Sequence, residues 1–140
     1  MSDERGQALV VAVLFLAVAA VAIVGLRAAQ DRIASVAEHR RAGEAAVEAA
    51  TAVIADAYVG ELRRALLSEP RATPDVAGAV GDGRALESAR AAASELSLRN
   101  GGTVVPSVGV RCADGAVTVS LVLSGASYRA GFAASECSPR

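Results

Sequence analysis

The chain has 140 residues, of which 53% are hydrophobic and 21% are charged, and its mean hydropathy is +0.39. This length has room for one domain. All fourteen basic residues are arginine, and fifteen acidic residues offset them to a formal net charge of −1. The absence of a basic excess, the single histidine and the lack of tryptophan argue against a nucleic-acid-binding protein and against a metal centre. We expect no cofactor.

An uncharged, apolar segment lies close to the N-terminus. No residue between Arg5 and Arg27 is charged, and from position 8 to position 26 every residue is apolar or glycine. As an α-helix, residues 8–26 would extend about 28 Å, close to the roughly 30 Å of a bilayer's hydrocarbon core. The sequence therefore predicts a transmembrane helix over residues 7–26.

A cleaved secretory signal is the alternative interpretation of this segment, with Ala20-Val21-Ala22 as its small-residue cleavage site. Two features argue against it. Asp3 and Glu4 beside Arg5 make a poor positively charged leading region, and the apolar segment is longer than the roughly 7–15 residues usual in signals. A retained anchor is the favoured interpretation.

The sequence contains two signals about orientation, and they disagree. Arg27 and Arg32 follow the apolar segment whereas only Arg5 precedes it, which taken alone places the body of the chain in the cytoplasm. The two cysteines, Cys112 and Cys137, instead suit an oxidising compartment. A disulfide between them would close a loop of about 25 residues, worth about 3 kcal/mol; two unpaired thiols are the alternative.

The helical pattern continues beyond the membrane segment, over residues 27–67. No proline occurs before Pro70, and apolar residues recur along one stripe at helical spacing. This stripe either receives the C-terminal domain of the same chain or packs against neighbouring subunits, and its length favours a mixture. We predict helix packing for Val47, Ile54, Tyr58 and Leu62 in particular. The stripe consists of Ile33, Val36, Val47, Ala50, Ile54, Tyr58, Leu62 and Ala65, and the helix contains two glycines at which it can bend, Gly43 and Gly60.

A loop and a second helix are expected next. Residues 68–83 are rich in Pro, Gly, Thr and Asp and are predicted as a loop, with one helical turn starting at Thr73-Pro74-Asp75. The glycines of this loop do not indicate phosphate binding, because no strand precedes them and no Lys-Ser/Thr follows. From about Arg84 to Arg99 the pattern predicts an amphipathic helix, ended by Asn100-Gly101.

The remaining residues alternate as β-strands do. Residues 108–112 and 117–121 flank Asp114-Gly115, a type I′ turn signal. A two-residue turn pairs Cys112 with Val117 and places the apolar side chains of both strands on one face. Ser124-Gly125 turns the chain into a third strand. The predicted fold class is α+β, in which a long transmembrane-plus-amphipathic helix precedes a domain over residues 84–140 with a helix packed on a three-stranded antiparallel meander.

Few residues in the chain suit chemistry. His39 lies beside Arg40 and Arg41, without a cysteine or carboxylate at metal-ligand spacing, and is interpreted as a solvated helix residue. Glu44 and Glu48 are a like-charged i,i+4 pair. No serine has a histidine within reach of a plausible triad. We predict no catalytic residue, no metal site and no small-molecule substrate.

The N-terminal sequence Arg5-Gly6-Gln7-Ala8-Leu9-Val10, followed at once by an apolar helix, resembles the start of TadE/TadG-like proteins. These are minor pseudopilins and assembly factors of bacterial Tad (tight adherence, Flp-type) pili. The second half is similar to the small extracellular domain of actinobacterial members, with Arg99-Asn100-Gly101-Gly102, a strand reaching Cys112, the turn Asp114-Gly115 and the strand 117–122. The resemblance covers most of the chain except residues 68–83.

This resemblance implies an anchor in the cytoplasmic membrane with its N-terminus inside and the rest of the chain extracytoplasmic. It also implies that a prepilin peptidase cuts the Gly6–Gln7 bond and removes residues 1–6 as a leader. Pilin-like members usually carry Glu at the fifth mature position, here Val11. That carboxylate neutralises a neighbouring subunit's N-terminal ammonium in the apolar filament core. Its absence favours a tip, priming or uncleaved assembly component over a repeating subunit.

The preferred hypothesis is therefore a non-enzymatic, single-pass minor pilin or assembly factor of a Tad-type pilus. Its expected partners are the membrane, other pilus subunits and the prepilin peptidase. The alternative is a membrane-tethered extracellular binding module outside any filament, for which only Tyr58, Tyr128 and Phe132 supply aromatic side chains beyond the membrane. A small enzyme ranks last because the sequence offers neither a carboxylate pair nor a metal site.

Overall fold

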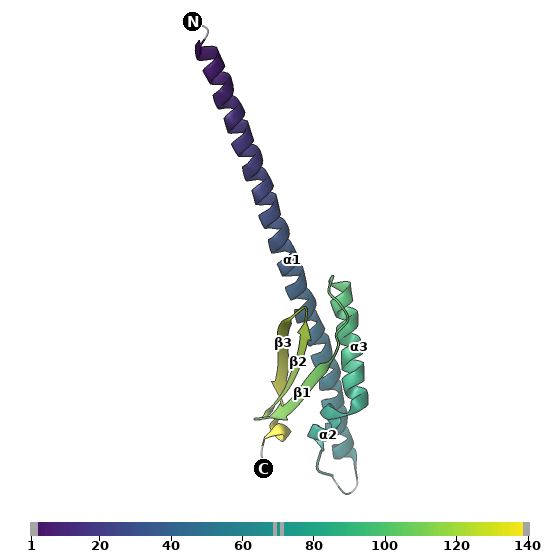
Figure 1. Cartoon of the computed structure of the whole chain (residues 1–140). Coiled ribbons are helices and arrows are strands. Elements are labelled where there is room, and N and C mark those ends of the chain that lie inside the picture. Colours follow the sequence, from purple (N-terminus) through teal and green to yellow (C-terminus); the bar gives the residue numbers. More distant parts are fainter. Residues whose placement is uncertain (1–2, 69, 71, 139–140) are drawn as a thin grey trace. The chain divides into compact units, whose positions relative to one another are not determined.

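The computed structural model describes residues 3–68, 70 and 72–138, with side chains from residue 11 onward. The fold is α+β, as predicted, and the chain divides into two units, Met1–Ala37 and Glu38–Arg140. The elements in order (Figure 1) are α1 (Asp3–Leu67), α2 (Val76–Gly81), α3 (Gly83–Arg99), β1 (Val108–Ala113), β2 (Ala116–Leu123), β3 (Ala126–Ala133) and the 3₁₀ helix η1 (Ser135–Cys137).

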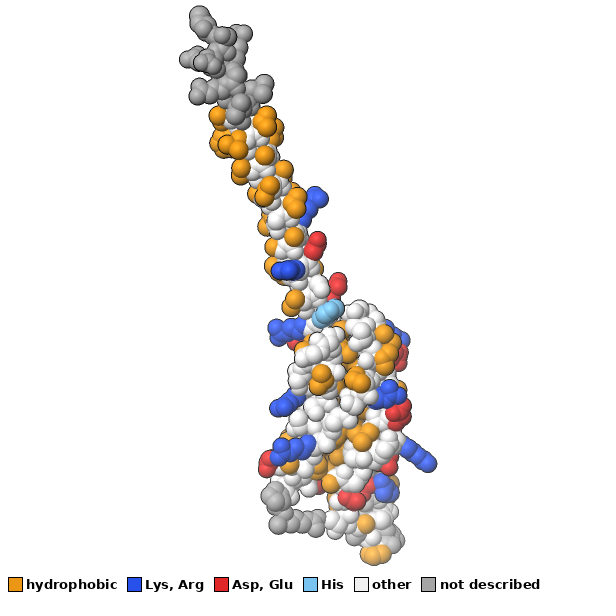
Figure 2. Space-filling model, in the orientation of Figure 1, with side chains coloured by type: hydrophobic (Ala, Val, Ile, Leu, Met, Phe, Trp, Pro, Cys, Tyr) orange, Lys and Arg blue, Asp and Glu red, His pale blue; other side chains and the backbone are white. Residues whose placement is uncertain are grey.

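The first unit consists of the beginning of α1, which is exposed throughout its described side chains. Every side chain from Val11 to Val36 is exposed, including Phe15 at 71% and Val21 at 74%. Figure 2 shows hydrophobic side chains around this part of the helix. Of the described helices, only α1 is long and apolar enough to cross a membrane. The predicted cleavage residues Gly6 and Gln7 fall within α1, but their side chains lie outside the described residues.

In the second unit, α1 turns one stripe of small and branched side chains toward the core. Ala42, Ala46, Val47, Ala50 and Ile54 are all buried, at spacings of three and four residues. Val47, Ala50 and Ile54 belong to the predicted stripe, which the chain therefore covers itself in this part of α1. Along the rest of the stripe, Ala65 is buried, Tyr58 and Leu62 are half-buried, and Ile33 and Val36 are exposed.

The sheet is an antiparallel meander in the order β1-β2-β3, with the register that the sequence predicts. Cys112 lies opposite Val117 in the β1–β2 pair. The β1–β2 turn has positive φ at Asp114 and Gly115, and the β2–β3 turn has positive φ at Ser124 and Gly125. Both turns thus have the backbone of a type I′ hairpin, which matches the twist of the flanking strands.

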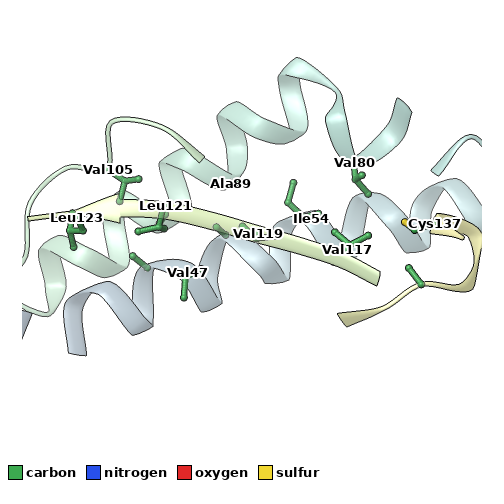
Figure 3. Close-up of a cluster of buried hydrophobic side chains, with 14 of the residues drawn as sticks. Val47, Ile54, Val80, Ala89, Val105, Val117, Val119, Leu121, Leu123 and Cys137 are labelled. Carbon is green, nitrogen blue, oxygen red and sulfur yellow. The ribbon is translucent and has the colours of Figure 1, made fainter. Parts of the chain in front are cut away.

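One face of this sheet meets the helices and forms the core. In Figure 1 the sheet lies in front of the second half of α1, with α3 beside it. Alternate residues of β2 point onto the helices, and Figure 3 shows them between α1 and α3. The buried residues of β2 are Val117, Val119, Leu121 and Leu123; α2 and α3 add Val76, Val80, Ala89 and Ala93.

Residues 68–83, predicted as a loop with one helical turn, contain the six-residue helix α2. The Asp75 carboxylate caps α2 by accepting a hydrogen bond from the Gly78 N–H, and Asp82 caps α3 in the same way. Helix α3 ends at Arg99, with Gly101 at φ 78° as the predicted left-handed stop.

Gly43 has a packing role that its sequence context did not reveal. It is buried inside α1, which continues through it, and a Cβ at this position would overlap the ring of Tyr128 in β3. The Tyr128 hydroxyl also donates a hydrogen bond to the His39 carbonyl oxygen, 3.3 Å away. The missing side chain therefore lets the sheet approach α1 closely at this level.

We predict that Gly43→Ala destabilises the domain by about 1–3 kcal/mol, because the added methyl displaces the Tyr128 ring. Gly60→Ala is the matched control, since that glycine lies in the same helix with open space around it. It should instead stabilise the domain by roughly 0.5–1 kcal/mol, the ordinary helix preference of alanine over glycine. Urea unfolding of the protein in detergent micelles, followed by circular dichroism, measures both changes. Equal effects of the two substitutions would contradict this role.

Candidate functional site

The C-terminal end of the chain is covalently tied to the sheet. Cys112 in β1 and Cys137 in η1 form a disulfide with their Cα atoms 5.0 Å apart, at a sequence separation of 25. Cys137 is buried and Cys112 is half-buried. The predicted disulfide is thus present, and it closes the end of the domain beside β1.

A second contact ties the same end to α1. The Tyr58 hydroxyl donates a hydrogen bond to a carboxylate oxygen of Glu136, 2.7 Å away, and the Tyr58 ring packs against Phe132 with ring centres 5.4 Å apart. This hydrogen bond lowers the pKa of Glu136 and raises the pKa of Tyr58, because it is strongest between the ionised acid and the neutral phenol. Tyr58 and Phe132, two of the three aromatic residues considered for a binding surface, therefore contact each other, and Tyr58 also binds Glu136.

The residues predicted for helix packing take up two positions in the domain. Val47 and Ile54 lie within the core, where Figure 3 shows them on α1 beside the residues of β2. Tyr58 and Leu62 lie at its rim, half-buried against it. These four side chains therefore pack against the chain's own sheet and helices.

Glu61 is a buried charge that sequence analysis missed. It is 6% exposed, its carboxylate accepts a hydrogen bond from the Asp75 backbone N–H at 2.9 Å, and it forms an ion pair with Arg64. It thereby fastens the segment before α2 to α1. The sequence did contain a signal of its burial, because Glu61 lies on the apolar stripe, three residues after Tyr58 and four before Ala65.

Two serines of α3 hold the connection to β1, and they also escaped sequence analysis. The Ser97 hydroxyl donates to the Thr103 carbonyl oxygen at 2.7 Å. The Ser94 hydroxyl oxygen accepts from the Val105 N–H at 3.1 Å. Buried backbone groups need such partners, and these two bonds fix where the sheet begins.

Residues considered for chemistry do not assemble into a reactive site. His39 is exposed, and within the part of the chain that the structure describes, no three His, Cys, Asp or Glu side chains are arranged to hold a metal ion. Glu44 pairs with Arg40 at 2.7 Å. An open hollow of about 540 Å³ beside α2 contains Glu61 and Asp75, but both carboxylates already serve the structural contacts described above.

Comparisons of the chain with protein-family models, with curated proteins and with solved structures found no match. The geometry of the domain and the character of α1 therefore carry the functional argument.

We predict that Cys112→Ser destabilises the domain by about 3 kcal/mol, the chain-entropy value for a loop of this size. Reductant should lower the stability of the native protein by a similar amount and leave that of the variant unchanged. Urea unfolding with and without reductant measures both. A variant as stable as the oxidised protein would show that the bond contributes nothing.

The Tyr58–Glu136 hydrogen bond should make stability depend on pH. Because folding lowers the pKa of Glu136, its contribution is complete above the ordinary glutamate value of 4.5 and is lost as the pH falls through the lowered pKa. Because folding raises the pKa of Tyr58, a second loss follows as the pH rises from 10.0 through the raised value.

Tyr58→Phe removes this hydrogen bond, so the stability difference between native protein and variant should be present at pH 7 and shrink in acid. Tyr128→Phe is the control, because its hydroxyl donates to a backbone carbonyl that does not titrate in this range. Unfolding free energies from pH 2 to pH 7 test this, and a Tyr58→Phe difference independent of pH would contradict it.

Proposed function

We propose that the chain is a non-enzymatic, single-pass membrane protein that serves a Tad-type pilus as a TadE/TadG-like minor pilin or assembly factor. One observation carries the proposal: within the single helix α1, the beginning is apolar and wholly exposed, and the second half is the spine of an α+β domain. This combination suits a protein held in the membrane by the same helix that organises its folded domain.

The exposed beginning of α1 needs an apolar environment. Six large hydrophobic side chains between Val11 and Leu26 are more than 60% exposed: Leu14, Phe15, Leu16, Val21, Val24 and Leu26. Exposed apolar surface costs about 25 cal/mol per Å² in water, and a bilayer or a bundle of similar helices removes that cost. Helical geometry satisfies the backbone in either setting.

The disulfide supports an extracytoplasmic domain. Thiols in the cytoplasm are generally kept reduced, whereas the Cys112–Cys137 bond joins the end of the chain to β1. The opposing signal is a small excess of arginine after the membrane segment, at Arg27 and Arg32 against Arg5. We give the covalent bond more weight, because a surplus of one arginine orients a helix weakly.

The position in a pilus is inferred from Val11. A carboxylate there would neutralise the N-terminal ammonium of an adjacent subunit in an apolar filament core. Valine offers no such partner, so repeated stacking would bury an uncompensated charge if Gly6–Gln7 is cleaved. A tip or priming subunit, or an uncleaved assembly factor, avoids that cost.

Val18→Arg tests the anchor, because an arginine near the centre of the span costs about 2.5–3.5 kcal/mol on insertion. Val18 is exposed in α1, so the substitution leaves the domain's core untouched. We expect the native protein and Val18→Leu to stay in carbonate-washed membranes and Val18→Arg to be lost from them. Retention of Val18→Arg at native levels would contradict the anchor.

In the native host, deleting the gene should remove pili from the cell surface in electron micrographs. Native protein and Val18→Leu should restore them, and Val18→Arg should not. Abundant pili in the deletion strain would contradict the pilus role and favour the membrane-tethered binding module.

The orientation of the domain can be tested by chemical labelling. Ser127 is exposed, so we expect the Ser127→Cys protein to react with a membrane-impermeant maleimide on intact spheroplasts. Labelling only after lysis would contradict the extracytoplasmic orientation.

A further inference from the structure

The outer face of the sheet, turned away from α1, forms a shallow basic trough. A hollow of about 370 Å³ there is lined by Thr118, Ser120, two arginines (Arg111 and Arg129) and one acidic residue, Asp114. A second hollow continues it past Arg129 to Gly131. The other lining residues are mostly alanine and glycine, whose short side chains make the surface between the arginines shallow. The two guanidinium groups therefore lie beside the hydroxyl groups of Thr118 and Ser120. We call this surface the sheet trough.

The sheet trough has an excess of unneutralised positive charge. Among the described residues, no carboxylate lies within ion-pair distance of Arg129, and Arg111 reaches only Asp114, at 3.8 Å, with both side chains more than three-quarters exposed. Guanidinium groups recognise carboxylates through paired N–H donors. The trough therefore suits a surface that presents carboxylates on a low ridge.

The opposite side of the same unit presents such a ridge. Residues Glu48, Ala52, Asp56 and Gly60 follow one another at four-residue intervals along α1, and all are exposed. No arginine of the described chain pairs with Glu48 or Asp56, and the positions three and four residues from each carry no basic residue. We call this surface the helix ridge.

The charges of the two surfaces have matching spacing. Eight residues of α-helix separate Glu48 from Asp56, a rise of about 12 Å. Across the sheet, Arg111 lies opposite Thr118 and Arg129 lies opposite Ser120. The two arginines are therefore two strand spacings apart across the sheet and two residues apart along the strands. This separation places their Cα atoms roughly 12 Å apart, close to the rise between Glu48 and Asp56.

We propose that the helix ridge of one copy of this chain docks into the sheet trough of a second copy. The two carboxylates meet the two guanidinium groups, and Ala52 and Gly60 let the helix backbone approach the low floor of the trough. Because ridge and trough are different surfaces, the contact is heterologous, and each copy keeps a free ridge or trough for a further copy until the assembly closes into a ring.

Anchoring makes this contact effective. Ion pairs between exposed side chains contribute little singly, so isolated domains in dilute solution should associate weakly. Copies held in one membrane have a high effective concentration. The inference thus rests on the anchoring part of the proposed function and does not require a place in the filament.

Cysteine cross-linking in native membranes tests the contact. The structure contains no free cysteine among its described residues. Ala52→Cys marks the middle of the ridge and Thr118→Cys the middle of the trough, so they meet whichever way round the charges pair. Full-length proteins carrying one substitution each, with different epitope tags, are co-expressed, and their membranes are oxidised briefly. We expect a doubly tagged dimer at least fivefold more abundant than with Ala91→Cys, an exposed position on α3, in place of Ala52→Cys.

Charge reversal provides the second test. Arg111→Glu with Arg129→Glu in the Thr118→Cys copy should reduce the cross-linked dimer at least fivefold. Glu48→Arg with Asp56→Arg in the Ala52→Cys copy should then restore it. Arg84→Glu, an exposed arginine outside both surfaces, should have no effect. Circular dichroism of each variant confirms that the domain is folded.

Two outcomes overturn the proposal. The first is that Ala52→Cys copies cross-link to each other more readily than to Thr118→Cys. The second is that the ridge–trough dimer forms no more than with Ala91→Cys, including the result that Thr118→Cys cross-links only to other proteins. If this happens while the protein remains in carbonate-washed membranes, the contact fails and the anchor stands; if the protein is absent from membranes, both fail.

Discussion

The domain depends on α1 keeping small side chains on the face that meets the sheet. Ala42, Ala46 and Ala50 are completely buried, and Gly43 leaves room for the Tyr128 ring. The largest fully buried side chains of the domain are valine and isoleucine, with no aromatic among them. The core is thus formed by close approach of the sheet to the helix, with small side chains between them in place of bulky ones. A larger side chain on this face would separate the layers, which is why the packing of one helix determines the position of the whole sheet.

A core of this kind gains from additional ties at its margins. The Cys112–Cys137 disulfide joins η1 to β1, the Tyr58–Glu136 hydrogen bond joins η1 to α1, and the Glu61–Asp75 hydrogen bond joins the segment before α2 to α1. A small domain with a limited core is the setting in which a disulfide contributes most to stability. The spacing of Arg111 and Arg129 on the outer face of the sheet is set by strand pairing, since Arg111 lies opposite Thr118 and Arg129 opposite Ser120.

Local patterns predicted most of the fold. Alternation and the Asp114-Gly115 turn determine the β1–β2 register because a slip of one residue would expose every apolar side chain of the strand, and the long stripe of α1 predicts its buried face. What escaped prediction depends on long-range contacts: Gly43 resembled a bend because Tyr128 is distant in sequence, and the short helix α2 depends on the Asp75 cap and on Glu61. The sheet trough joins residues of three strands, and its match with the helix ridge required the register of all three.

The most direct test of a membrane-anchored, disulfide-closed domain is the intact mass of protein purified from native membranes and alkylated before and after reduction. We expect a chain that begins at Gln7 if the protein is a cleaved minor pilin, or at Met1 if it is an uncleaved assembly factor. In both cases it should take up no alkylating reagent when oxidised and two equivalents after reduction. A chain that begins near Ile23 would mean a cleaved signal and a released domain. Two thiols that react without reduction would place the domain in a reducing compartment, and either result would contradict the account.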